Sequence, residues 1–201
     1  MSAPSPRVPV IAIEEHYWDD ELASHFTGAE ASRAGVIEKR LRDFGGERIQ
    51  DMDAAGIDIC VLSHGAPSSQ KIPADIAIPL VRRVNDRLAA AVAANPTRLA
   101  AFAALPTADP QAAADELERC VAMGFKGAMV HGSCNGEFID LPKYWPIFAR
   151  AEQLDVPIAL LTLAYDSDKS TRERLFRDIQ PGEFYPVYGD ESVKGFDAQS
   201  T

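Results

Sequence analysis

The sequence has few of the features that would tie a protein to a membrane, a nucleic acid or an oxidising compartment. Its apolar runs are far shorter than the roughly 20 residues that cross a bilayer. Its 30 acidic and 20 basic side chains give a formal net charge of -10. Charge repulsion therefore argues against a nucleic-acid partner or an anionic membrane surface. Only three cysteines occur, none in a C-x-x-C pair, and no apolar leader precedes a cleavage site. We expect reduced thiols in a cytoplasmic protein.

Nucleotide-binding motifs are missing as well. No Gly-x-Gly-x-x-Gly follows the first apolar run, and no Gly-x-x-x-x-Gly-Lys occurs anywhere. These absences argue against a dinucleotide or nucleoside-triphosphate site. Histidine is also scarce, with four in the chain and none after His131. Within this sequence, all histidines lie in the first 131 residues.

What the sequence does contain is an alternation of short apolar runs with helical patterns. Near-continuous apolar runs are typical of parallel strands that are buried on both faces, and they cover 8–13, 57–63, 99–105, 127–130 and 156–163. The helical patterns between them cover 45–55, 77–94, 109–123 and 141–154. This alternation predicts an α/β fold with a parallel sheet that is either open or curled. Without nucleotide motifs, a barrel-type sheet is favoured.

The predicted domain ends where the alternation ends. Residues 8–163 would form an incomplete TIM-type (β/α)8 barrel of about five βα units. Residues 164–201 are polar, contain glycine and proline and have few aliphatic side chains, so we expect an irregular or disordered tail. An incomplete barrel leaves two edge strands with exposed apolar faces, which favours a homo-oligomer.

Polar side chains follow three of the predicted strands. Glu14 and His16 end the first strand, and side chains two residues apart on a strand share a face. A carboxylate and an imidazole on one face suit a divalent metal, although a solvated strand end would show the same pattern. His64 and His131 follow the second and fourth strands and could face the same mouth. Each could equally be a satisfied polar residue at a strand end.

An ordered series of segments resembles one enzyme family. The segments are 13–16, 48–58, 61–67, 84–86, 96–106, 124–128, 138–148 and 155–158. Together they resemble the amidohydrolase-related metal-dependent decarboxylases that act on γ-resorcylate, 2,3-dihydroxybenzoate and aminocarboxymuconate semialdehyde. The resemblance covers about the first half of such proteins. It implies a carboxy-lyase that acts on a small hydroxylated aromatic acid.

The resemblance also implies roles for individual residues. Glu14 and His16 would bind Zn or Mn, and His131 or His64 would act as the catalytic acid. His25 and Phe26 would lie over the mouth of the site and contact substrate. The family places a third metal-binding histidine after the fifth strand, but this chain reads Ala-Leu-Leu-Thr from position 159. A truncated, catalytically inactive fragment and a metal-dependent hydrolase therefore remain alternatives.

Overall fold

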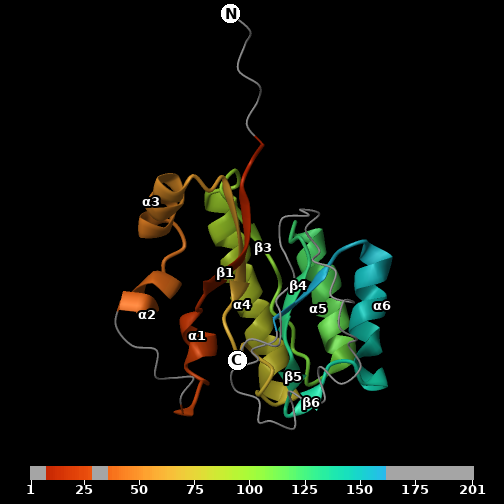
Figure 1. The fold of residues 1–201 in the computed structure, drawn as a ribbon. Coiled ribbons are helices and arrows are strands. Elements are labelled where there is room, and N and C mark those ends of the chain that lie inside the picture. Colours follow the sequence, from red (N-terminus) through yellow and green to blue (C-terminus); the bar gives the residue numbers. More distant parts are fainter. Residues whose placement is uncertain (1–7, 29–35, 162–201) are drawn as a thin grey trace, which may run out of the picture. The chain divides into compact units, whose positions relative to one another are not determined.

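The computed structural model describes residues 8–28 and 36–161 (Figure 1). Five parallel strands overlap the five predicted apolar runs: β1 (Ile11–Tyr17), β2 (Ile59–His64), β3 (Leu99–Ala101), β4 (Ala128–His131) and β7 (Ile158–Leu161). The α/β class with parallel strands is thus confirmed. The predicted tail, 164–201, lies outside the described residues.

The five strands are hydrogen-bonded in chain order. β1, β2 and β3 form one parallel sheet, and β4 pairs with β7 in parallel. The two groups meet at a single bridge between Ala103 and Ala128. The ladder between β3 and β4 is therefore shorter than the others, and backbone hydrogen bonds from Lys126 to Ala101, from Ala103 to Gly127 and from Met129 to Ala103 supply the connection there.

Helices follow the strands; the two short helices before residue 45 were not predicted, whereas the later ones overlap the predicted helical patterns. After β1 come α1 (Asp20–Ala23), α2 (Val36–Leu41) and α3 (Gly46–Ala55), whose last turn ends at Gly56 with φ +70°. After β2 comes α4 (Ala74–Ala94), and after β3 comes α5 (Pro110–Ala122) with Asp109 as its N-cap. In the part of the chain that is described, no helix combines the length and apolarity that a membrane crossing requires.

The segment between β4 and β7 contains a small hairpin and the last helix. The hairpin strands are β5 (Ser133–Cys134) and β6 (Glu137–Phe138), which pair antiparallel. A 3-10 turn (Pro142–Tyr144) leads into α6 (Trp145–Leu154), which packs beside α5. The predicted helix 141–154 is therefore two consecutive elements.

Both faces of the sheet are apolar, but they are covered differently. The outer face of the sheet is the face that the helices cover, and the inner face is the opposite one. The outer face and the helices share the main core, which includes Leu62, Leu88, Leu117 and Val130. The inner face carries a second cluster of three buried side chains: Val61, Phe102 and Met129. Ala159 and Leu161 on β7 pack against this second cluster. Along their strands, these inner-face residues come before the C-terminal strand ends that carry the candidate site.

The first strand begins later than predicted. Val8 and Val10 are 80% and 46% exposed and precede β1. The strand then continues through Glu14, Glu15 and His16 to Tyr17. Its apolar start, Ile11 and Ala12, pairs with Ile59 and Cys60, and its polar end also pairs with β2. Hydrogen bonding to β2, rather than apolarity, decides where this strand lies.

Candidate metal and substrate site at the C-terminal edge of the sheet

A β-bulge includes Glu14, one candidate metal ligand, and precedes His16, the other. Ala12 is opposite Cys60 and Glu15 is opposite Leu62, so Ile13 and Glu14 together face one residue of β2. After the bulge, side chains alternate again. His16 lies opposite Ser63 on the inner face, and Glu14, two residues earlier, is exposed. A bulge interrupts the regular alternation, so the pairing with β2 assigns a face to the imidazole of His16 only.

His16 is held through both its ring and its backbone. Its Nδ1 lies 3.0 Å from the Oγ of Ser63, and its carbonyl accepts a hydrogen bond of 2.9 Å from Arg48 Nη2. The Arg48 side chain, only 11% exposed, also donates to the carbonyl oxygens of Asp43 and Arg40 at 2.8 and 3.3 Å. One guanidinium thus ties the end of β1 to α2 and to the turn before α3.

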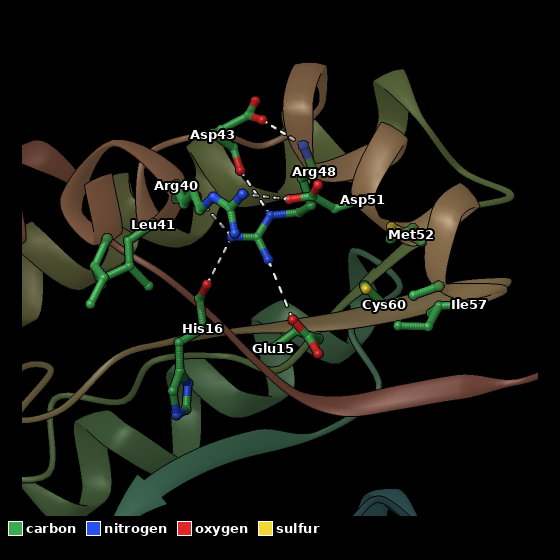
Figure 2. A pocket seen from close by; sticks show the side chains of 12 residues that line it. Glu15, His16, Arg40, Leu41, Asp43, Arg48, Asp51, Met52, Ile57 and Cys60 are labelled. Carbon is green, nitrogen blue, oxygen red and sulfur yellow. Dashed lines mark hydrogen bonds and ion pairs between the residues drawn. The ribbon is translucent and has the colours of Figure 1, made fainter. Parts of the chain in front are cut away.

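Arg48 borders a pocket of about 360 Å³ on the outer side of β1 (Figure 2). Glu15 faces this pocket and lies 3.7 Å from Arg48 Nη1, whereas the imidazole of His16 points away from it. The remaining lining is largely apolar and comes from α2, α3 and the start of β2: Ile37, Leu41, Met52, Ala55, Ile57 and Cys60. The imidazole of His16 therefore projects from the opposite face of the strand.

The structure brings His131 to His16. His131 is 6% exposed at the end of β4, and the centroids of the two imidazole rings are 6.2 Å apart. The strands that carry them are separated by β2 and β3. Three strand spacings in a flat sheet would amount to about 14 Å. The sheet must therefore curve strongly to bring these rings together.

His64 does not offer a ring nitrogen to a substrate. Its Nε2 accepts from the backbone N–H of Asp19 at 3.0 Å, and its Nδ1 lies 2.9 Å from the Gly65 carbonyl. The side chain is 1% exposed, and burial lowers its pKa to about 4. The expectation that His64 acts as a catalytic acid is corrected on this geometry: the ring is neutral and both nitrogens bond to the backbone.

The two residues expected over the mouth have different surroundings. His25 is exposed just after α1. Phe26 is 8% exposed and packs edge-on against Trp18 and His64, with ring centroids 5.5 and 5.8 Å apart. Its aromatic faces are occupied by protein. The expected substrate contact of Phe26 is therefore replaced by a packing role beside His64.

Asp19 anchors this aromatic group. Its carboxylate caps α1 and accepts two hydrogen bonds from Arg87, at 2.6 and 2.8 Å. Burial alone would raise the pKa of Asp19, but hydrogen bonds from Arg87 and from the backbone of Leu22 outweigh it, so the pKa is lowered. The ionised carboxylate and its partners hold the backbone N–H that binds His64.

The donors available to a divalent cation are limited. Among residues 8–28 and 36–161, no group of three histidine, cysteine or acidic side chains is placed so as to hold a metal ion. All four histidines belong to these ranges. At the end of β7, Leu161 pairs with His131 and presents an aliphatic side chain to the inner face. Glu14 and His16 remain the two predicted donors, a carboxylate and an imidazole, and both groups suit a divalent cation.

Sequence reasoning missed the residues that hold these side chains. Ser63 contacts His16, Arg48 binds its carbonyl, and Gln70 binds the backbone of His131. Gln70 and His131 are 61 positions apart, and no motif marks either partner. The period-two pattern finds a ligand pair on one strand, but it cannot find a contact between distant loops.

Comparison with known proteins identifies relatives that match this part of the fold. The sequence matches the amidohydrolase family over residues 11–187. It is 42% identical over 159 residues to a γ-resorcylate decarboxylase of Rhizobium sp. (strain MTP-10005), covering 75% of this chain and 49% of that protein. It is 40% identical over 162 residues to the enzyme of the same name from Rhodococcus jostii (strain RHA1), with the same coverage. The chain thus spans about half the length of these relatives.

Solved structures show the same relationship. A dihydroxybenzoic acid decarboxylase from Polaromonas sp. JS666, with bound manganese and the inhibitor 2-nitroresorcinol, superposes with a TM-score of 0.70 and 36% identity. The match covers 84% of this chain and 53% of that one. A 2,6-dihydroxybenzoate decarboxylase in complex with 2,6-dihydroxybenzoate gives a TM-score of 0.70, 37% identity and coverage of 84% and 54%. This protein therefore belongs to the amidohydrolase family.

Proposed function

We propose that this protein is a metal-dependent carboxy-lyase that removes carbon dioxide from a small hydroxylated aromatic acid. The observation that carries the proposal is the meeting of His16 and His131 at 6.2 Å from opposite ends of a four-strand segment. Two imidazoles that meet at one strand edge support a site in which one would bind a metal and the other would exchange a proton. The identity to γ-resorcylate decarboxylases and the manganese in a related structure support the same reaction.

Glu14 and His16 would hold the divalent cation. Both Mn²⁺ and Zn²⁺ accept a carboxylate oxygen and an imidazole nitrogen, so the donors fit such an ion in kind without choosing between the two. Because the described residues contain no group of three histidine, cysteine or acidic side chains that could hold a metal ion, water would complete the coordination and binding would be weak. When bound, the cation would supply positive charge beside the oxygens of the substrate.

Side chains of this protein would deliver the proton that the reaction requires. Loss of carbon dioxide breaks a carbon–carbon bond and leaves the electron pair on the ring carbon, which must then take up a proton. His131 is the imidazole best placed to deliver it, because both ring nitrogens of His64 bond to the backbone. Ser63 would orient the ring of His16 through Nδ1.

We extend the proposal to the fold and the assembly. The strong curvature between β1 and β4 supports an incomplete (β/α)8 barrel. Ile11 and Ile13 on β1, 51% and 41% exposed, support a homo-oligomer that covers them. The three buried free thiols of Cys60, Cys120 and Cys134 are compatible with a cytoplasmic location. Gel filtration with light scattering would test the assembly, and a monomer would contradict it.

A second candidate, a protein of this family without turnover, is favoured by one specific observation. Leu161 stands next to His131 at the strand edge, where a third donor would complete a metal cluster. In that case the fold would persist while affinity for the cation falls too low for catalysis.

Titration with Mn²⁺, combined with a carbon dioxide release assay on 2,6-dihydroxybenzoate, tests both candidates. We expect E14Q and H16N each to weaken Mn²⁺ binding at least about tenfold. E152Q, at an exposed position of α6, is the matched control and should bind like the wild type. Binding with release supports the lyase, and binding without release supports the second candidate. Equal binding by all variants would contradict the proposed ligands.

A further inference from the structure

A buried amide after β2 holds the end of β4. Gln70 is 3% exposed. Its Oε1 accepts from the backbone N–H of His131 at 2.5 Å, and its Nε2 donates to the carbonyls of His131 and Ser133 at 2.5 and 2.7 Å. One side chain thus bonds both backbone groups of His131, as a neighbouring strand would. The backbone of Gln70 also accepts a hydrogen bond of 3.2 Å from the N–H of Asn135.

The ring of His131 is fixed by a second contact. Its Nε2 lies 3.1 Å from the carbonyl oxygen of His64. A carbonyl oxygen only accepts hydrogen bonds, so Nε2 must carry the hydrogen. A neutral His131 ring then has its lone pair on Nδ1. The distance therefore assigns the tautomer.

We propose that Gln70 is a positioning residue that fixes His131 as the Nε2–H tautomer, together with the His64 carbonyl. Any proton that His131 exchanges with a bound molecule would then pass through Nδ1. The link to proton delivery rests on the proposed function, whereas the tautomer and its dependence on Gln70 do not.

The chain offers a matched control for this amide. Asn85 is fully buried on α4 and bonds both backbone groups of Ala104, at 3.1 and 3.0 Å. Its Nδ2 also donates to Glu116 at 2.8 Å. N85D and Q70E make the same chemical change: a donor is replaced by a carboxylate oxygen that faces a backbone carbonyl. Both remove buried hydrogen bonds, but only Q70E touches His131.

Long-range ¹H–¹⁵N NMR of the histidine rings in metal-free protein near neutral pH measures the tautomer directly. H131N assigns the His131 signals. We expect a strong difference between the two His131 nitrogens, with the Nε2–H pattern, in the wild type and in N85D. In Q70E the two nitrogen shifts should converge toward the average of exchanging tautomers. An Nδ1–H pattern in the wild type, or an unchanged pattern in Q70E, would overturn the proposal.

Two further arms keep the test decisive. Should Q70E fail to fold, Q70N keeps the amide but is one methylene too short to reach both backbone groups, and the same convergence is expected. In the carbon dioxide release assay, Q70E should lower kcat about tenfold or more with KM changed less than about twofold. If no variant or wild type shows turnover, the lyase proposal fails while the tautomer result stands by itself.

Discussion

Replacing Arg48 with methionine should separate the contribution of the guanidinium from that of the aliphatic stem. R48M removes the donors to the carbonyls of His16, Asp43 and Arg40. Hydrogen bonds that involve a charged partner contribute about 1.5–3 kcal/mol each. The two shorter bonds and the low exposure of 11% lead us to expect a loss of about 3 kcal/mol in the free energy of unfolding. With an m-value of about 2 kcal/mol/M, the urea midpoint would fall by about 1.5 M.

Arg40 provides the comparison for the same assay. Its side chain is 61% exposed and makes an ion pair of 3.8 Å with Asp51. We expect R40M to change the free energy of unfolding by less than about 0.5 kcal/mol. R48M should also weaken Mn²⁺ binding, because the carbonyl of His16 is no longer held. Equal urea midpoints for R48M and R40M would refute the view that Arg48 ties β1 to α2 and α3.

Three further predictions concern other parts of the fold. His64 has a pKa of 6.5 when unperturbed and about 4 when folded, so between these values the unfolded chain binds more protons. Stability should therefore fall by roughly 3 kcal/mol as pH drops from 6.5 to 4, and thermal unfolding of H64N should lack most of this slope. Gly127 has φ +144°, and an added Cβ would overlap the Pro157 carbonyl oxygen. In urea unfolding, G127A should therefore lower the free energy of unfolding by at least about 3 kcal/mol. G124A, at a glycine with open space around it, should lower it by only about 1–2 kcal/mol. A thiol reagent should label none of the three buried cysteines of the native protein quickly and all three in urea, and rapid native labelling would contradict their burial.

The sequence was sufficient to locate the strands, because continuous apolar runs mark strands that are covered on both faces. Apolarity could not decide their ends. Val8 and Val10 look like the start of a strand but are exposed, while the polar segment from Glu15 to Tyr17 is paired. The third strand was predicted to reach 105, but it ends at Ala101 because Ala104 bonds to the side chain of Asn85 instead.

The site was predictable only where it depends on one strand. Period-two alternation predicts Glu14 and His16 on one face, but the bulge that interrupts this alternation appears only in the pairing with β2. The state of His64 depends on the backbone of Asp19, 45 positions away, which converts a candidate acid into a neutral buried ring. The contact of Gln70 likewise depends on a distant partner, because His131 belongs to a separate βα unit. Contacts of this kind follow from the tertiary fold and have no local signal.

The two buried amides explain how the curved strand edge keeps its shape where the ladder is weakest. Between β3 and β4 the described residues share one bridge, at Ala103 and Ala128. Just beyond it, Asn85 bonds the backbone of Ala104, and Gln70 bonds that of His131. Each side-chain amide donates to and accepts from the backbone at a strand end, as a neighbouring strand in a flat sheet would. Strong curvature separates neighbouring backbones at this edge, so side chains from the preceding helix and turn must satisfy them. Loss of either amide should therefore loosen the strand edge, but only the loss of Gln70 should release His131 from its fixed orientation toward His16.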